Sequence, residues 1–298
     1  MTRPRIGITV MKARRDLAHL GDHLDEVERL GAEAAELPFY DLDLVVAGRP
    51  IAGQVRLLEQ ACAGRGLAYT VHGPHPANFF DEPFRSERHF EVMKACLEAA
   101  AAVGAVHYVV HTGFCPKTSA EALEDAYARQ RDWLHRAGDL AKTLGLAICV
   151  ENVFDWEWGK LDTASPSRLA REIAAIGHDS VRATLDFGHA HLEAGFRGGD
   201  VLEEMKALAP FARHLHIHDN LGRPDDIYMY TDGERLAYGH GDLHLPVGWG
   251  SVPWDEIVAR CTFPADAVLN IELDPRYWHA ARECVAATRA LAERMTLA

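Results

Sequence analysis

Eight times along the chain, a short apolar run rich in β-forming residues is followed by a longer stretch with helical spacing of its apolar residues. The expected strands cover residues 5–10, 32–37, 67–72, 105–111, 146–151, 181–186, 212–218 and 267–272. The expected helices cover residues 17–30, 51–63, 85–103, 120–144, 166–176, 199–208, 254–260 and 279–294. Eight such units in 298 residues are typical of an α/β fold, the (β/α)8 barrel.

No linker or shift in composition divides the chain, so we expect a single domain over residues 1–298. An open doubly wound sheet is the alternative fold, but no glycine-rich phosphate-binding turn follows the first expected strand. The segment 219–253 is too long for an ordinary connection and is rich in Gly, Asp and Tyr. We expect it to lie over the C-terminal face of the barrel, where barrels place their active sites.

Six consecutive expected strands end in histidine, aspartate or glutamate. The residues at these ends are His72, His111, Glu151, Asp186 with His189 just beyond it, the alternating His214, His216 and His218, and Glu272. An Asp-x-His pair, Asp242 and His244, lies in the segment 219–253. One histidine at a strand end is more often a hydrogen-bonded structural residue than a ligand. Six consecutive ends, however, would converge on one small volume at the mouth of a barrel.

Carboxylates gathered in that volume would repel one another unless a cation lay between them. Mixed imidazole and carboxylate ligands suit zinc or manganese, and also iron or cobalt, better than calcium or magnesium. A set without cysteine is typical of a catalytic rather than a structural site. We therefore predict a divalent metal site, with zinc or manganese as the first choice.

Four further residues are candidates for substrate binding, each with a plainer interpretation beside it. Trp156 follows the fifth expected strand and would either wall a pocket or pack a loop. Arg276 follows the eighth and could meet an anionic group, although solvated surface charge is more common. His75 and Asn78 follow the third strand and would either contact a substrate or support the metal ligands from behind. His107 begins the fourth strand and is interpreted as structural.

The amino-acid composition limits the binding partners and the cellular compartment that we expect for the protein. Lys and Arg number 31 against 44 Asp and Glu, a net charge of −13 that disfavours long polyanions such as duplex DNA. The six cysteines form no C-x-x-C pair and several lie in apolar runs, which fits a reducing cytoplasm. We expect no signal peptide and no membrane span, because neither pattern is present.

In their order along the chain, these residues resemble the xylose isomerase-like barrel superfamily, which contains sugar-phosphate isomerases, epimerases and endonuclease IV. The resemblance runs from Arg5 to the last expected helix. It implies one divalent ion held by a Glu-Asp-His-Glu set. The corresponding residues here are Glu151, Asp186, His216 and Glu272. His216 is assigned because the family motif His-x-x-Asp places the ligand three residues before an acid, here Asp219, which leaves His218 in a non-ligand position.

The endonuclease IV pattern is fuller and is similar to this chain at nine positions. Those positions are His72, His111, Glu151, Asp186, His189, His216, Asp242, His244 and Glu272, which the resemblance implies are ligands of up to three ions. The chain departs from that pattern in the segment between Asp219 and Asp242, which is longer. It also has His75 where a tyrosine is common.

The nine-residue set favours a metal-dependent hydrolase acting on a small phosphoester or phosphosugar-like compound. At least two ions about 3.5–4 Å apart are expected, with Glu151 or Glu272 orienting the attacking water. The alternative is a sugar or sugar-phosphate isomerase or epimerase with a single ion, in which the same two glutamates exchange protons with carbon. A second alternative is an abasic-site endonuclease, and a non-catalytic metal-binding barrel is a further one. Substrate and oligomeric state stay open, a homo-oligomer included.

Overall fold

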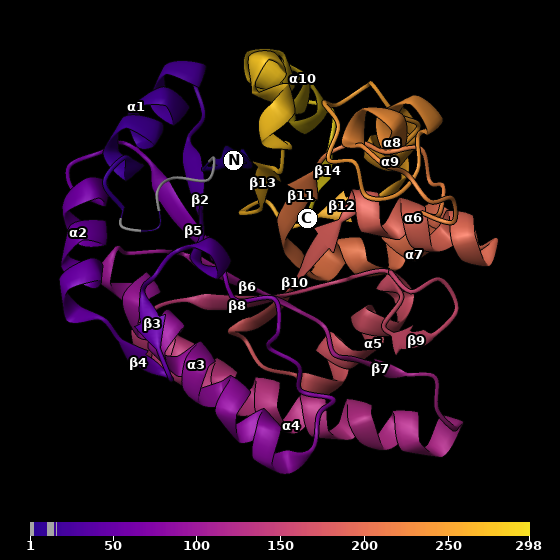
Figure 1. Ribbon diagram of the computed structural model, residues 1–298, viewed down its shortest axis with the longest axis horizontal. Helices are drawn as coiled ribbons and strands as arrows, with labels where there is room; N and C mark the ends of the chain where they lie inside the picture. The colour runs from indigo at the N-terminus through magenta and orange to yellow at the C-terminus, as the bar shows by residue number, and fades with distance from the viewer. Residues whose placement is uncertain (1–2, 11–14, 16) are drawn as a thin grey trace.

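Eight parallel strands form a closed barrel in the computed structural model, which describes residues 3–10, 15 and 17–298 (Figure 1). The order of the strands around the barrel is β1-β13-β11-β10-β8-β6-β5-β2. Their bounds are β1 (Arg5–Thr9), β2 (Ala34–Pro38), β5 (Ala68–His72), β6 (His107–His111), β8 (Ala147–Glu151), β10 (Val181–Asp186), β11 (Ala212–Ile217) and β13 (Val268–Ile271). The predicted (β/α)8 barrel is therefore confirmed.

Helices surround the barrel (Figure 1). They are α1 (Leu20–Leu30), α2 (Ala52–Cys62), α3 (Pro83–Ala102), α4 (Ala120–Leu144), α5 (Pro166–Ile176), α6 (Phe187–Arg197), α7 (Val201–Leu208), α8 (Asp232–Tyr238), α9 (Trp254–Arg260) and α10 (Ala281–Ala292). Three 3-10 turns are η1 (Phe39–Asp41), η2 (Ala209–Phe211) and η3 (Pro275–Ala280). Across the described ranges, no helix has both the length and the apolar character needed to cross a bilayer.

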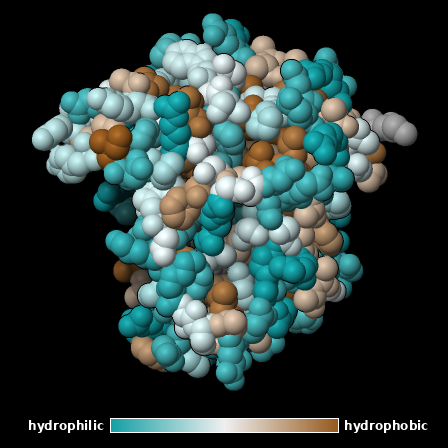
Figure 2. Space-filling model, turned by 90° about the vertical axis from the view of Figure 1, so that its right-hand side faces the viewer, coloured by the Kyte–Doolittle hydropathy of each residue, from teal (hydrophilic) through white to brown (hydrophobic). Residues whose placement is uncertain are grey.

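Within the described residues, three small strand pairs lie outside the barrel sheet. They join β3 (Val45–Val46) to β4 (Arg49–Pro50), β7 (Phe114–Pro116) to β9 (Leu161–Thr163), and β12 (Thr262–Phe263) to β14 (Thr296–Leu297). The face of the molecule in Figure 2 is mainly hydrophilic, with hydrophobic residues in small separate areas.

Local signals explain where several helices begin and end. The Ser119 hydroxyl accepts a hydrogen bond from the backbone N–H of Ala122 at the start of α4, and the Ser165 hydroxyl does the same for Arg168 in α5. Helix α4 ends at Gly145, whose φ of 76° is the left-handed conformation that glycine adopts at little cost. Both helices have the predicted bounds.

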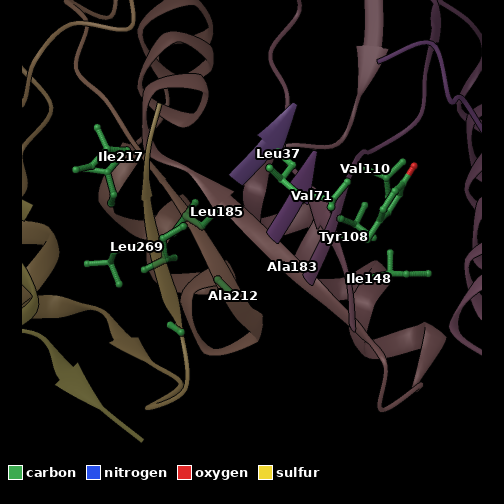
Figure 3. Packing of buried hydrophobic residues seen from close by; sticks show 14 of the residues in the cluster. Leu37, Val71, Tyr108, Val110, Ile148, Ala183, Leu185, Ala212, Ile217 and Leu269 are labelled. Atoms are coloured by element: carbon green, nitrogen blue, oxygen red, sulfur yellow. The ribbon is translucent and has the colours of Figure 1, made fainter. Parts of the chain in front are cut away.

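Side chains alternate along each barrel strand, so one set faces the helices and the other faces the barrel axis. The outer set is apolar and packs in the hydrophobic core, as Leu37, Val71, Ile148, Leu185 and Leu269 do (Figure 3). The inner set includes polar residues that alternate with the apolar ones, among them Glu36, His72, Glu151, Asp186 and Asn270, all buried. The apolar outer set stabilises the strands by packing against the helices. The polar inner set is therefore available for a functional site.

Helix α6 is a correction, because no helix is expected between the strand 181–186 and the helix 199–208. Asp186 is the N-cap of this helix, and its Oδ1 accepts a hydrogen bond of 2.6 Å from the backbone N–H of His189. Gly188 lowers the helix propensity of the sequence, but a side chain there has no room. An added Cβ would lie 2.1 Å from Cε1 of His218. His189 therefore projects from the first turn of a helix.

The segment 219–253 leaves the end of β11 and returns to it. Asp219 and Leu245 form an antiparallel bridge with two backbone hydrogen bonds of 2.9 Å. The buried Asp219 carboxylate also accepts hydrogen bonds from the backbone N–H groups of Gly248 and Val252 and from Nε1 of Trp254. One carboxylate thus fastens the returning part of the segment against the end of the strand.

Replacing Asp219 with alanine should destabilise the protein by about 3 kcal/mol or more, because several buried N–H donors would lose their acceptor together. Denaturant unfolding of Asp219→Ala would measure this change. Asp179→Ala removes an exposed carboxylate and should stay within about 0.5 kcal/mol of the wild type. Equal stability of the two variants would contradict the role given to Asp219.

Candidate metal centre

Four residues at the carboxyl ends of neighbouring strands form what we call the first group: Glu151 of β8, Asp186 of β10, His216 of β11 and Glu272 just after β13. Each offers a ligand atom, and these atoms all lie within 4.8 Å of one another. Nδ1 of His216 lies at the centre. It is 3.1 Å from Oε1 of Glu151, 3.5 Å from Oδ2 of Asp186 and 3.3 Å from Oε2 of Glu272.

Strand register and one amide hold the first group in place. Asp186 is level with His216 in the pairing of β10 with β11. The side-chain amide of Asn152 accepts a hydrogen bond from the backbone N–H of Asp186 at 2.9 Å and donates one to its carbonyl at 3.0 Å. Of the adjacent residues Glu151 and Asn152, the first is therefore part of the site and the second holds the backbone of Asp186 in place.

A second group consists of His189, His218, Asp242 and His244, again with ligand atoms within 4.8 Å of one another. Oδ2 of Asp242 lies 3.3 Å from Nε2 of His189 and 2.9 Å from Nε2 of His244. Nδ1 of His218 and Oδ1 of Asp242 are buried without a hydrogen-bond partner and lie 3.9 Å apart. The resemblance leaves His218 in a non-ligand position, whereas the structure places it inside this group.

A third group, His72, His75 and His111, lines the opposite side of Glu151. Nε2 of His72 and Nε2 of His111 lie 3.2 and 3.6 Å from Oε2 of Glu151. The ring of His75 stacks between those of Tyr40 and His111, with centroid separations of 4.2 and 5.0 Å. Because His189 also lies 3.2 Å from Oε1 of Glu151, this carboxylate stands where the three groups meet.

Backbone carbonyls orient three of the histidines. Nδ1 of His72, His189 and His244 donates to the carbonyl oxygens of Gly73, Asn152 and Glu272, at 2.9, 3.0 and 3.0 Å. A carbonyl oxygen can only accept, so each neutral imidazole keeps its proton on Nδ1 and directs Nε2 toward the carboxylates. This is the arrangement of histidines that bind metals.

The electrostatics of the site are those of carboxylates balanced by protonated imidazoles. Burial alone would lower the pKa of His216, but Glu272 and Glu151 outweigh it and raise that pKa well above its ordinary value. In the same way, Asp242 outweighs burial and raises the pKa of His244 to about 10. Burial raises the pKa of Glu272, whereas His216 and His111 overcome burial at Glu151 and lower its pKa. Protons held in this way are the ones that a binding metal ion displaces.

The remaining predicted residues lie outside the three groups. Asn78 bonds through both ends of its amide to the backbone of Phe114 and Phe80. Trp156 is 40% exposed and contacts the ring of Phe114 edge-on. Arg276 forms an ion pair of 2.6 Å with Asp232. The nine predicted ligands and His75 are therefore brought together, and Asn78, Trp156 and Arg276 are not.

Three more buried residues lie in the interior: Glu36, which the sequence pattern does not single out; His214, which the pattern places at a strand end without a ligand role; and His107, which is interpreted as structural. Glu36 lies beneath the first group, 3.3 Å from Nε2 of His216 and 3.0 Å from Nε2 of His214. The signal for Glu36 was present, since it is a carboxylate within the apolar run of the second strand. Burial, with the neighbouring His214, lowers the pKa of His107 to about 3, so that histidine is neutral.

The protein is a closed parallel barrel with imidazoles and carboxylates gathered at the carboxyl ends of its strands. It therefore falls in the class of (β/α)8 barrels that have a candidate metal site at the strand ends. Residues 24–289 match the xylose isomerase-like TIM barrel family, and the chain belongs to it. The superfamily predicted from the sequence is confirmed. An uncharacterized protein of Methanocaldococcus jannaschii is 22% identical over 183 residues, which are 61% of this chain and 55% of that protein. The match therefore spans about half the length of that relative.

Solved structures share the fold over nearly the whole chain. A D-tagatose 3-epimerase-like protein has a TM-score of 0.71 at 18% identity, covering 97% of this chain and 98% of that one. The 3-keto-D-glucoside 4-epimerase YcjR of E. coli has a TM-score of 0.66 at 16% identity, covering 97% and 100%. The IolI protein, described with a bound zinc atom, has a TM-score of 0.68 at 15% identity, covering 96% of each chain.

These comparisons contradict the prediction of a metal-dependent hydrolase. Several of the similar structures are described as sugar epimerases, including D-psicose and L-ribulose 3-epimerases, and another as a putative sugar phosphate isomerase/epimerase. The nine-residue set misled the sequence analysis because ligand-type residues specify that a metal can bind, whereas the reaction depends on the substrate that the mouth admits.

Proposed function

We propose that this protein is a metal-dependent epimerase or isomerase of a keto sugar or a related sugar derivative. The observation that carries the proposal is the first group, in which two glutamates flank one histidine nitrogen at the barrel mouth. The epimerases among the similar structures support the same class of reaction. Because the net charge of −13 disfavours nucleic acid, we propose a small-molecule substrate; association of the protein with itself is left open.

The first group fits a divalent ion. Three carboxylates and one imidazole converge there in a buried site, a donor set suited to zinc or manganese, with iron or cobalt as alternatives. When bound, such an ion polarises a carbonyl and an adjoining hydroxyl of the substrate. The zinc atom in the IolI structure supports the proposal of a metal without fixing which one.

Glu151 and Glu272 are the proposed catalytic residues. They come from β8 and from the end of β13, which are separated in the barrel by β11 and β10, so they approach the mouth from different sides. One carboxylate removes a proton from the carbon next to the carbonyl, and the electron pair moves into an enediolate. Return of a proton by the other carboxylate, on the opposite face, inverts that carbon. Return to the former carbonyl carbon gives the isomerase reaction instead.

The second and third groups extend the site. The unpartnered atoms of His218 and Asp242 fit a further ion, held with His189 and His244. The stacked rings of Tyr40, His75 and His111 would form a wall for a sugar ring, and His72 and His111 are also placed to act as ligands beside Glu151. We therefore propose one ion for the reaction and up to two more around it.

Incubation with keto sugars in D2O tests the proposal directly. The zinc- or manganese-loaded protein should incorporate deuterium at the carbon next to the carbonyl of a substrate sugar, because the abstracted proton exchanges with solvent on the carboxylate. Proton NMR of a panel containing D-tagatose, 3-keto-D-glucosides and other ketoses would detect this. Failure to exchange a carbon-bound proton in any keto sugar of the panel would count against the proposed function.

A further inference from the structure

Glu36 is a fully buried carboxylate that faces the barrel axis beneath the first group. Its Oε2 lies 3.3 Å from Nε2 of His216 and 3.0 Å from Nε2 of His214. Its Oε1 accepts hydrogen bonds from Oγ1 of Thr9 at 2.9 Å and from Nδ2 of Asn270 at 3.0 Å. Glu36 thus touches a residue of the candidate centre while being held by groups outside it.

Four polar groups from three other strands are arranged around this one carboxylate. Burying an ionised carboxylate is costly unless hydrogen-bond donors and opposite charge compensate it. Thr9 on β1 and Asn270 on β13 donate hydrogen bonds to it, and Nε2 of His214 on β11 lies 3.0 Å away; none of the three belongs to the first group. The carboxylate is thereby fixed in orientation, with Oε2 directed at His216.

His216 differs from the neighbouring histidines in which ring nitrogen faces the carboxylates of the site and in what the other ring nitrogen contacts. His72, His189 and His244 direct Nδ1 to a backbone carbonyl and present Nε2 to the carboxylates. His216 is turned the other way. Its Nδ1 faces the first group, and its Nε2 faces Glu36. A metal can bind Nδ1 only if that atom carries no proton, so the proton of the neutral ring must lie on Nε2.

We propose that Glu36 is a positioning residue for the metal centre: it accepts the Nε2 proton of His216 in a hydrogen bond, and so holds the ring with Nδ1 free to bind the ion of the first group. The inference rests on the proposed function, because it presupposes an ion in that group. A carboxylate behind a metal-bound histidine fixes both its tautomer and its orientation, and loss of such a partner typically weakens metal affinity about 10- to 100-fold.

Competition titration of the metal-free protein measures this effect without any sugar. Zn2+ would be titrated against a chromophoric chelator into wild type, Glu36→Gln and a matched control, Glu172→Gln. Glu172 is also buried and paired, to Arg131 and Arg168, but lies outside the barrel interior. Zinc affinity should fall about 10- to 100-fold in Glu36→Gln and stay unchanged in Glu172→Gln.

Two further measurements keep the test decisive. Thr9→Val removes one donor to Glu36 without touching the first group, and it should weaken zinc binding less than Glu36→Gln but in the same direction. In 15N-histidine-labelled, zinc-loaded wild type, NMR should find the His216 proton on Nε2, and this signal should shift or broaden in Glu36→Gln. A merely structural Glu36 would leave that tautomer signal unchanged.

The outcomes separate the two proposals. Wild-type zinc affinity and an unchanged His216 signal in Glu36→Gln would overturn the role of Glu36 while leaving the proposed function intact. An equal loss of affinity in Glu172→Gln would also overturn it, because the effect would then be general. A wild type that binds neither Zn2+ nor Mn2+ would overturn the proposed function itself.

Discussion

Replacement of Glu272 by glutamine should lower turnover of a substrate sugar by about 10²- to 10⁴-fold, the usual contribution of a positioned general acid or base. The amide can neither take the proton from carbon nor supply a negative ligand to the first group. Glu151→Gln should have at least as large an effect, because Glu151 touches all three groups. Steady-state kinetics with saturating metal would measure both losses.

The metal content of each variant shows whether its loss of turnover comes from a lost metal ion or from a lost proton-transfer group. Glu172→Gln serves as the control, since it removes a buried carboxylate away from the mouth, and it should keep near wild-type turnover. If Glu272→Gln kept both its metal and a normal turnover, the assignment of Glu272 as a catalytic residue would be wrong. Loss of turnover with the metal retained would instead isolate the proton-transfer role.

Removal of metal should destabilise the protein by a large amount. In the metal-free protein, protons held on imidazoles such as His216 balance the carboxylates of the first group, and a binding ion displaces them. An ion that binds only the folded state stabilises it by about 2.7 kcal/mol at 100 times its Kd. Thermal unfolding should therefore show Tm several degrees higher with Zn2+ or Mn2+ than with a chelator.

Elemental analysis of the same samples counts the ions. One ion per chain would correspond to the first group alone, and two or three would mean that the second and third groups are filled as well. A Tm that does not depend on metal, in a protein purified without bound metal, would contradict the assignment of these groups as a metal centre.

The sequence predicts the barrel well because two features mark a strand end: the apolar run stops, and a polar side chain of the site follows. At Glu151 and Asp186 an apolar run stops at a carboxylate, and both expected strands end at those residues in the structure. Helix α6 is missed because Gly188 and two histidines obscure its pattern, although Asp186 three residues before His189 is a recognisable N-cap.

The site is less predictable where residues far apart in the sequence meet. His218 joins the second group because the segment 219–253 folds back and brings Asp242 and His244 against it, a contact that no local pattern encodes. Glu36 is missed because it is an interior residue of its strand rather than the last one. Its partners Thr9, His214 and Asn270 become neighbours only when the barrel closes.

That closure has a consequence for how the chain acquires its structure. Asn270 donates to Thr9 across 261 residues of sequence, and β13 pairs directly with β1. Chains dominated by such distant pairings fold slowly, because loop-closure entropy is lost before the contacts form. During synthesis the first seven barrel strands emerge before the last one. The carboxylates of β2, β8 and β10 therefore reach their final surroundings only after β13 pairs, which makes assembly of the candidate metal centre one of the last steps of folding.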